Sequence, residues 1–353
     1  MKSMNYPILG FRFDFHQNRT SKRQFKMYNA KHQCITVTIF RDEAPYIINL
    51  SVSANAVTTL KQIKMRQFTI SILIFISYFT TYGQVKVNPN GKFFNYNGIK
   101  IYYEDTGNGE PLLLLHNFFG TADQWKPYVE AYSKQFRTIA IDMMGHGRSD
   151  IYKKGDINFK HADYAKIIFA LLDSLKLNKV NAIGGSSGGM TLLYLNTSQP
   201  ERFKSVITIG PQIYYSKHAR EWIAKIGQDS ALRQLGFLCC FNVKFMELAT
   251  EQHGAEKAMF LARQFWQNQK LYGDPSFTPD ILSTIKAKWL VVQGDNDEIV
   301  PLQNAIDMYQ YIPNSRLWII PNGGHLPYLV ADNQAEFLKV SLEFLNGKWD
   351  KKD

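Results

Sequence analysis

The segment from Val180 to Leu195, VNAIGGSSGGMTLLYL, constrains the fold of this chain more than any other stretch. An apolar run ends in a Gly-Gly-Ser-Ser-Gly-Gly turn, and the turn leads directly into a helical pattern. Small residues on both sides let a serine occupy a sharply turned backbone at a helix N-terminus, with its hydroxyl projecting outward. The segment therefore predicts a strand, a tight turn and a helix, with a reactive serine at the turn.

Two Gly-x-Ser-x-Gly frames overlap in this turn, one centred on Ser186 and one on Ser187. The first frame keeps a four-residue strand ahead of it and leaves Gly189 for close packing of the helix. Ser186 is therefore favoured as the nucleophile, and Ser187 is the alternative. A phosphate-binding loop is also rich in glycine, but this turn lacks its Gly-Lys-Ser/Thr ending, and its position between strand and helix argues against a flexible linker.

The rest of the body alternates between apolar runs of strand length and stretches with helical spacing. Asn97-Gly98 joins two alternating stretches and predicts an antiparallel hairpin. Apolar runs typical of buried parallel strands occupy residues 112–115, 138–141, 180–183, 206–209, 289–292 and 317–320. Helical patterns cover residues 161–175, 188–197 and about 333–345, the last with Asn333 and Glu336 spaced as in a capping box. This order predicts an α/β fold with a doubly wound, mostly parallel sheet.

One interval breaks this rhythm. The stretch between Ile209 and Trp289 is too long for an ordinary connection and reads as helices with polar links. Residues 211–280 are therefore predicted to form an inserted helical lid over the carboxyl edge of the sheet. The core domain is expected to comprise residues 84–210 and 281–353.

Residues 65–83 have the layout of a secretory signal peptide. Arg66 follows a methionine, an apolar stretch runs from Phe68 to Phe79, and small or polar residues follow up to Gly83. The apolar stretch is 12 residues long, shorter than the roughly 18 that a spanning helix needs. We therefore expect an exported protein, periplasmic or secreted, that contacts the membrane only through this segment if it is uncleaved. A weak membrane anchor or a buried element is the alternative.

Residues 1–64 carry most of the excess positive charge. The formal net charge is +11, of which residues 1–64 supply +7 and residues 84–353 only +3. The body shows no basic stripe interleaved with aromatic residues, so no nucleic-acid partner is expected. Strand periodicity in residues 1–64 appears only at 35–40, and we expect a non-native or disordered extension ahead of a true start at Met65.

The cysteines predict neither a set of disulfide bonds nor a metal site. Cys34, Cys239 and Cys240 are too few for a set of disulfides, and two of them are adjacent. No Cys/His spacing matches a zinc site, so neither a metal nor a cofactor is expected.

Together with the serine turn, four further motifs resemble those of the α/β-hydrolase superfamily. They are LLLLHNFFG at 112–120, IDMMGHGRSD at 141–150, VVQGDNDEIVP at 291–301 and IPNGGHLPYL at 320–329. They occur in the family's order, and the resemblance covers about residues 92–346. It implies an eight-stranded α/β-hydrolase sheet with a helical lid, and a serine esterase or lipase-like activity without a cofactor.

The resemblance also implies the partners of the serine. A serine hydroxyl needs a base to take its proton, and His325 stands where the family has its histidine. The chain order serine, acid, histidine is the one expected for this fold. Asp297 matches the acid, because the family places it three residues beyond a glycine, here Gly294. Asp295 is the alternative, with capping of the turn as its simpler role.

An oxyanion hole would be formed by the backbone N–H groups of Phe118 and Ser187. The chain departs from the family here, since Asn117 follows His116 where the family usually has His-Gly. Asparagine tolerates unusual backbone angles better than most residues, which would preserve the loop. His116 and His146 are expected to brace loops rather than to act on substrate.

Hydrolysis of a carboxylic ester is the leading functional hypothesis, with a small-molecule ester or amide as substrate. A peptidase or amidase and a carbon–carbon bond hydrolase would use the same three residues. The His-Gly-Gly-Pro-Gly loop expected of proline-specific aminopeptidases is absent. A non-catalytic ligand-binding protein of the same fold is the alternative from a different class.

Overall fold

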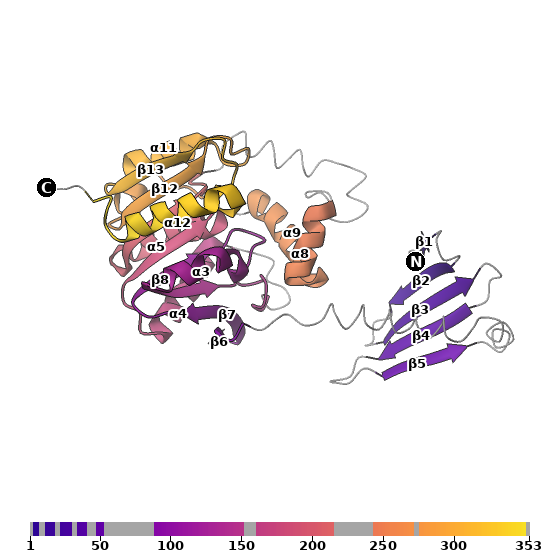
Figure 1. Ribbon diagram of the computed structural model, residues 1–353. Helices are drawn as coiled ribbons and strands as arrows, with labels where there is room; N and C mark the ends of the chain where they lie inside the picture. The colour runs from indigo at the N-terminus through magenta and orange to yellow at the C-terminus, as the bar shows by residue number, and fades with distance from the viewer. Residues whose placement is uncertain are drawn as a thin grey trace. The chain divides into compact units, whose positions relative to one another are not determined.

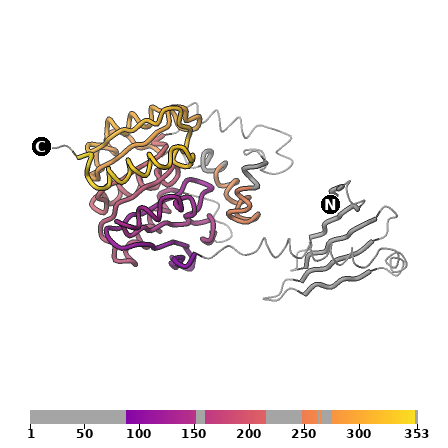
Figure 2. The backbone as a smooth tube through the Cα atoms, viewed as in Figure 1, coloured from indigo at the N-terminus to yellow at the C-terminus, as the bar shows by residue number. Residues whose placement is uncertain are grey.

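The computed structural model describes residues 88–151, 160–214, 243–271 and 275–350, together with five strands between residues 3 and 52. The chain divides into two compact units, Met1–Val87 and Asn88–Asp353. The second unit contains every motif on which the functional hypothesis depends. Its path can be followed in Figure 2 from the strand that begins at Gly91 to the helix that ends at Leu345.

An eight-stranded sheet forms the centre of the second unit, in the order β13-β12-β11-β10-β8-β9-β7-β6 (Figure 1). The six strands from β13 to β9 pair in parallel, whereas β7 pairs antiparallel with both β9 and β6. The strands are β6 (Gly91–Tyr96), β7 (Ile99–Thr106), β8 (Glu110–Leu115), β9 (Phe136–Ile141), β10 (Val180–Gly185), β11 (Phe203–Ile209), β12 (Lys288–Gly294) and β13 (Ser315–Ile320). The predicted α/β fold with a mostly parallel, eight-stranded sheet is confirmed.

Helices cover both faces of this sheet, as the alternation of strand side chains requires. Leu112 and Leu114 face one way, toward α3 (Lys126–Tyr132) and α12 (Ala331–Leu345). Their neighbours Leu113 and Leu115 face the other way, into the cluster that includes buried residues of α4 (His161–Ser174), α5 (Ser187–Ser198) and α11 (Leu302–Tyr311). Each face of the sheet thus has its own hydrophobic core. Short 3-10 turns lie at η2 (Ala122–Trp125), η3 (Pro200–Arg202) and η4 (Pro327–Leu329).

The hairpin and most helices occur where the sequence predicts them, but the start of the last helix differs. Asn97 and Gly98 have φ angles of 51° and 86°, the left-handed pair that a two-residue hairpin needs. Helix α12 begins at Ala331 rather than at the predicted Asn333. The Asn333 side chain donates to the Pro327 carbonyl oxygen at 3.1 Å. The capping-box interpretation is therefore wrong, because this side chain bonds to the preceding turn.

The predicted insert contains α8 (Val243–His253) and α9 (Ala255–Leu271), and α10 (Pro279–Ser283) crosses its predicted end at residue 280. Ala249, Ala258 and Leu261 are buried in the same core cluster as α4 and α5, so α8 and α9 pack against the main body. Most of the described part of the insert is helical, whereas residues 211–214 and 275–278 are not. Residues 215–242, including Cys239 and Cys240, lie outside the described residues, and the role of a lid stays a prediction.

The first unit contains a five-stranded antiparallel sheet in the order β1 to β5. Its strands are β1 (Ser3–Tyr6), β2 (Phe11–Gln17), β3 (Lys22–Asn29), β4 (Cys34–Phe40) and β5 (Ile47–Val52). The sequence indicated a strand only at residues 35–40 and an extension without regular structure elsewhere, so this part of the prediction differs from the structure. The period-two pattern was present in β2, where Phe11, Phe13 and Phe15 alternate with polar residues.

The predicted signal peptide at residues 65–83 lies outside the described residues, and its function stays a prediction. None of the helices that the structure describes is both long and apolar enough to cross a membrane.

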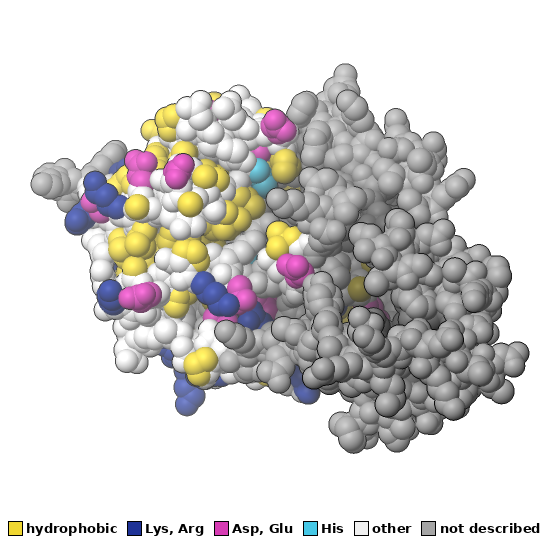
Figure 3. All heavy atoms as spheres, turned by 45° about the vertical axis from the view of Figure 1, so that its right-hand side comes forward, with side chains coloured by type: hydrophobic (Ala, Val, Ile, Leu, Met, Phe, Trp, Pro, Cys, Tyr) yellow, Lys and Arg dark blue, Asp and Glu magenta, His cyan; other side chains and the backbone are white. Residues whose placement is uncertain are grey.

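Charges on the surface of the second unit are mixed. On the face shown in Figure 3, basic side chains lie beside acidic ones, and hydrophobic side chains gather between them. Several exposed lysines form ion pairs, such as Lys126 with Asp123 at 2.9 Å and Lys204 with Glu110 at 2.7 Å. This mixture agrees with the small net charge that the sequence assigns to residues 84–353.

Candidate active site

Ser186 lies at the sharp turn between β10 and α5. Its backbone has φ 47° and ψ −111°, which is an unusual conformation for a residue with a side chain. Its N–H donates to the Ile209 carbonyl oxygen at 2.7 Å, and its carbonyl oxygen accepts from Met190 N–H at 2.8 Å. The surrounding sheet and helix thus hold the strained backbone in place, as the tight glycine-rich turn predicted.

Two glycines explain why the turn tolerates no larger residue. A Cβ atom at Gly184 would lie 2.7 Å from the Gly188 backbone, and one at Gly188 would lie 2.4 Å from the Leu115 carbonyl oxygen. The second contact joins the start of α5 to the end of β8. The turn is therefore pressed against the loop that follows β8.

Ser187, the alternative nucleophile, occupies a different position. It is the first residue of α5, and its side chain is buried. Its hydroxyl lies 2.9 Å from Nε2 of the buried His161. Burial lowers the pKa of His161 to about 3, which makes this histidine a poor base at neutral pH.

The three residues predicted to form a catalytic triad are joined in a row by two hydrogen bonds, with His325 in the middle. His325 Nδ1 is 2.8 Å from Asp297 Oδ2, and His325 Nε2 is 2.9 Å from Ser186 Oγ. A carboxylate can only accept, so Nδ1 carries the proton, Nε2 accepts, and the serine hydroxyl donates. Asp297 follows β12 and His325 follows β13, so all three residues stand beyond the carboxyl ends of parallel strands.

Asp297 is fixed by a full set of donors. Its Oδ1 accepts from the N–H groups of Ile299 at 2.9 Å and Val300 at 2.8 Å. Its Oδ2 accepts from Gln293 Nε2 at 2.7 Å in addition to His325. The side chain of Asp297 is 1% exposed. The alternative, Asp295, is exposed in the same turn.

Gln293 was missed by the sequence analysis. It is a fully buried residue of β12, and its amide also donates to the Val300 carbonyl oxygen at 3.1 Å. A polar side chain directly after the apolar run Trp289–Val292 was the signal that could have identified it, since buried polar groups require partners.

The loop after β8 supplies the predicted oxyanion residue Phe118. A Cβ atom at Gly188 would lie 2.7 Å from the His116 carbonyl oxygen, so this loop contacts the start of α5. Ser187 begins α5, and backbone N–H groups in a first helical turn have no acceptor within their own helix. The two predicted donors thus belong to adjoining segments. Their role in stabilising an oxyanion stays a prediction.

The backbone of this loop differs from the sequence-based expectation. Asn117 was expected to take the unusual backbone angles, but the positive φ, 65°, belongs to Phe119. Asn117 instead donates from its side chain to the Phe118 carbonyl oxygen at 2.7 Å. The asparagine therefore acts through its amide, which a glycine could not supply.

His116 and His146 lie behind the loop, where they were predicted to brace it. His116 Nδ1 lies 2.7 Å from the Asn117 carbonyl oxygen, and Met143 N–H donates to His116 Nε2 at 2.9 Å. Burial lowers the pKa of His116 to about 4 and that of His146 well below its usual range. Both rings are thus neutral structural elements at neutral pH.

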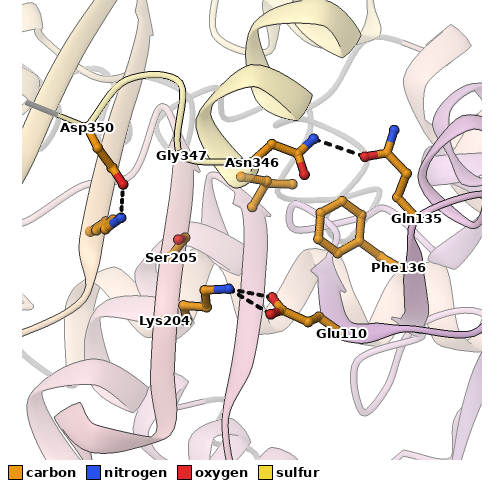
Figure 4. Close-up of a pocket in the computed structure, with 10 residues that line it drawn as sticks. Glu110, Gln135, Phe136, Lys204, Ser205, Asn346, Gly347 and Asp350 are labelled. Carbon is orange, nitrogen blue, oxygen red and sulfur yellow. Dashed lines mark hydrogen bonds and ion pairs between the residues drawn. The ribbon is translucent and has the colours of Figure 1, made fainter. Parts of the chain in front are cut away.

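A pocket of about 320 Å³ opens at the opposite end of the sheet (Figure 4). It lies where β8, β9, β11 and β12 begin, and Lys204 points at Glu110 across it with Nζ 2.7 Å from each carboxylate oxygen. Its main charges therefore neutralise each other, and it is remote from Ser186. The described residues contain no group of three His, Cys, Asp or Glu side chains that could hold a metal ion.

Comparisons with known proteins identify the family of the chain. Residues 110–332 match the family described as alpha/beta hydrolase fold. The chain is 24% identical over 279 residues to the 2-hydroxy-6-oxo-6-(2'-aminophenyl)hexa-2,4-dienoic acid hydrolase of Metapseudomonas resinovorans, covering 73% of this chain and 92% of that protein. It is 26% identical over 261 residues to the pimeloyl-[acyl-carrier protein] methyl ester esterase of Nitrosomonas europaea, covering 66% of this chain and 96% of that protein.

A solved structure also shares the fold. The meta-cleavage product hydrolase of Pseudomonas fluorescens IP01 superimposes with a TM-score of 0.58 at 20% identity, over 73% of this chain and 98% of that chain.

Proposed function

Because the chain belongs to the alpha/beta hydrolase family, we propose that it is a serine hydrolase that cleaves a carboxylic ester through an acyl-enzyme on Ser186. The observation that carries the proposal is the continuous run of hydrogen bonds from Asp297 through His325 to Ser186. This run supplies an activated nucleophile, a base and an orienting acid in one place.

In the first half of the reaction, Ser186 Oγ attacks the ester carbonyl carbon while His325 Nε2 takes the hydroxyl proton. The carbonyl oxygen becomes an oxyanion, which the N–H groups of Phe118 and Ser187 would stabilise. The tetrahedral intermediate then collapses. His325 returns the proton to the leaving alkoxide, and the alcohol departs from an acylated Ser186.

In the second half, His325 takes a proton from a water molecule that attacks the acyl carbon. The carboxylic acid leaves as the proton passes back to Ser186 Oγ, and the enzyme is restored. Asp297 keeps Nδ1 protonated throughout, so that Nε2 faces the serine, and its negative charge stabilises the imidazolium that forms in each step.

A fluorophosphonate probe tests the nucleophile directly. The wild-type protein should be labelled covalently, Ser186→Ala should lose labelling, and Ser187→Ala should keep it because its backbone N–H remains. Ser198→Ala, at the exposed end of the same helix, is the matched control and should be labelled like the wild type. An unlabelled wild-type protein would favour the non-catalytic ligand-binding alternative.

A second candidate is hydrolysis of a carbon–carbon bond. One relative is named for acting on a 2-hydroxy-6-oxo-dienoic acid, and the same nucleophile, base and acid would serve that reaction. Parallel assays with p-nitrophenyl esters of increasing chain length, a 2-hydroxy-6-oxo-dienoate and proline amides separate the three bond types. We expect the highest kcat/KM with an ester, and a higher value with the dienoate would replace the ester proposal.

A further inference from the structure

His253, the last residue of α8, joins the inserted helices to two loops of the core. Its ring is buried, with a residue exposure of 6%. Gly147 N–H donates to His253 Nδ1 at 2.8 Å, and His253 Nε2 lies 2.9 Å from the Phe119 carbonyl oxygen. One ring therefore contacts the loop that follows β8 and the loop that follows β9.

These partners determine the protonation of the ring. A backbone N–H can only donate, so Nδ1 must be an acceptor, and a carbonyl oxygen can only accept, so Nε2 carries the proton. The ring is thus neutral and has a single tautomer. Asp142, Lys257, His116 and His146 are the titratable groups around it, and burial lowers its pKa.

The hydrogen bond from His253 reaches the residue of the loop whose backbone is strained, Phe119. Phe119 has φ 65° and directly follows Phe118, the proposed oxyanion donor. A residue held at a positive φ keeps that conformation only when its surroundings determine it strongly. A hydrogen bond to the carbonyl oxygen of Phe119 fixes the peptide on one side of the strained residue, and Phe118 lies on the other side.

A second contact strengthens the attachment on the side of the other loop. Lys257, in α9, donates from Nζ to the Gly147 carbonyl oxygen at 2.9 Å and to the Ser149 carbonyl oxygen at 2.6 Å. Lys257 thus holds only the loop after β9, whereas His253 alone of these two side chains reaches Phe119. Phe265 of α9 adds ring contacts to the same loop, with centroid distances of 5.3 Å to Phe118 and 5.9 Å to Phe119. Of the hydrogen bonds made by His253 and Lys257, that of His253 is the one that reaches this loop.

We propose that His253 is a positioning residue that holds the Phe118–Phe119 loop in its active conformation and so makes catalysis depend on docking of the inserted helices. The proposal rests on the proposed hydrolase function. Loss of one oxyanion donor costs about 10²–10³ in kcat, and displacement of a donor costs less. Loss of the His253 contact should therefore lower kcat by roughly 10–100-fold, with little change in KM.

The two ring nitrogens can be tested separately with amide side chains. In His253→Gln the amide nitrogen reaches about as far as Nε2 and can donate to the Phe119 carbonyl oxygen. In His253→Asn the amide oxygen lies about where Nδ1 was and can only satisfy Gly147. We expect kcat on a p-nitrophenyl ester within about 5-fold of the wild type for Gln, and a loss as large as that of His253→Leu for Asn. Gln252→Ala, exposed on the same helix, should leave kcat unchanged.

Hydrogen–deuterium exchange provides a readout that does not require hydrolysis. Gly120 N–H donates to the Asn117 carbonyl oxygen at 2.9 Å within the loop, so its protection reports whether the loop is closed. Its exchange should be faster in the Leu and Asn variants and slow in the Gln variant. The role of His253 would be overturned if all variants had the same kcat and the same protection of Gly120. It would also be overturned if His253→Gln and His253→Asn lost the same amount of kcat. If the variants show the expected differences in exchange but the wild type hydrolyses no ester, only the proposed function is refuted.

Discussion

At the scale of single residues, the candidate site depends on groups that do not touch the substrate. Gln293 is the clearest case, because its amide donates to the same Asp297 oxygen that accepts from His325. Without this donor Asp297 Oδ2 loses one of its two partners and orients the imidazole less firmly, although Ile299 and Val300 still hold Oδ1.

We therefore expect Gln293→Leu to lower kcat about 10-fold, which corresponds to about 1.4 kcal/mol of transition-state stabilisation. This lies near the lower end of the roughly 1.5–3 kcal/mol that a hydrogen bond to a charged group contributes. KM should be unchanged, since the residue lies behind Asp297. Steady-state kinetics on a p-nitrophenyl ester measure both constants. Gln303→Leu is the matched control, because Gln303 donates to the Asp307 carboxylate at 2.7 Å on the exposed surface of α11, and an equal effect of both changes would contradict the role of Gln293.

His161 makes stability depend on pH. Burial lowers its folded-state pKa to about 3, whereas an unfolded histidine has a pKa of about 6.5. The unfolded state therefore binds a proton below pH 6.5 that the folded state excludes, so stability is complete above this pH and falls as the pH decreases toward 3.

Between pH 7 and pH 5 this residue should cost about 2 kcal/mol of unfolding free energy. In His161→Gln, an amide can replace the contact with Ser187 but does not titrate. Urea unfolding at the two pH values should show that the variant loses about 2 kcal/mol less than the wild type. Identical losses in both proteins would mean that His161 is protonated in the folded state as well.

At the scale of elements, the turn between β10 and α5 determines where the nucleophile stands. Its dependence on glycine can be measured as stability. Gly188→Ala places a methyl group 2.4 Å from the Leu115 carbonyl oxygen, whereas a Cβ at Gly324 meets nothing within 4 Å. Thermal unfolding should show a loss of about 3 kcal/mol for Gly188→Ala and a much smaller change for Gly324→Ala. A similar melting temperature for both would show that the turn can relax.

Element boundaries were harder to predict than the elements themselves. Helix capping depends on a single side-chain hydrogen bond. The Asn333 amide donates to the Pro327 carbonyl oxygen and does not cap the start of α12. The strands of the parallel sheet were predictable because uninterrupted apolar runs are required when both faces of a sheet are covered.

At the scale of the whole molecule, residues Asn88–Asp353 form a compact unit that contains the entire candidate site. We propose that translation starts at Met65 and that export removes the signal peptide at 65–83, so that the exported protein begins near residue 84. A protein that begins at residue 84 should keep the melting temperature of the full chain and a kcat within about 2-fold of it. A large loss of either would show that the first unit contributes to the fold or to the site. N-terminal mass spectrometry of the exported protein tests both points: an N-terminus near residue 84 shows cleavage, and a peptide from residues 1–64 would contradict a start at Met65.

Features with a local physical signal could be predicted from the amino-acid sequence. The strand, tight turn and helix around Ser186 follow from an apolar run and closely spaced glycines, and the Asn97-Gly98 hairpin follows from two residues that tolerate a positive φ. The acid and histidine motifs were identified by their resemblance to the α/β-hydrolase superfamily, in which serine, acid and histidine follow in this order.

The distant groups that support these residues could not be predicted and became visible in the folded chain. Gln293 reaches Asp297, His253 reaches Phe119 and Gly147, and Phe119 rather than Asn117 takes the strained backbone. Each of these contacts joins a side chain to a group whose position depends on the packing of whole elements. No periodicity along the chain encodes such a contact, because a hydrogen bond depends on the distance and direction between two atoms after folding.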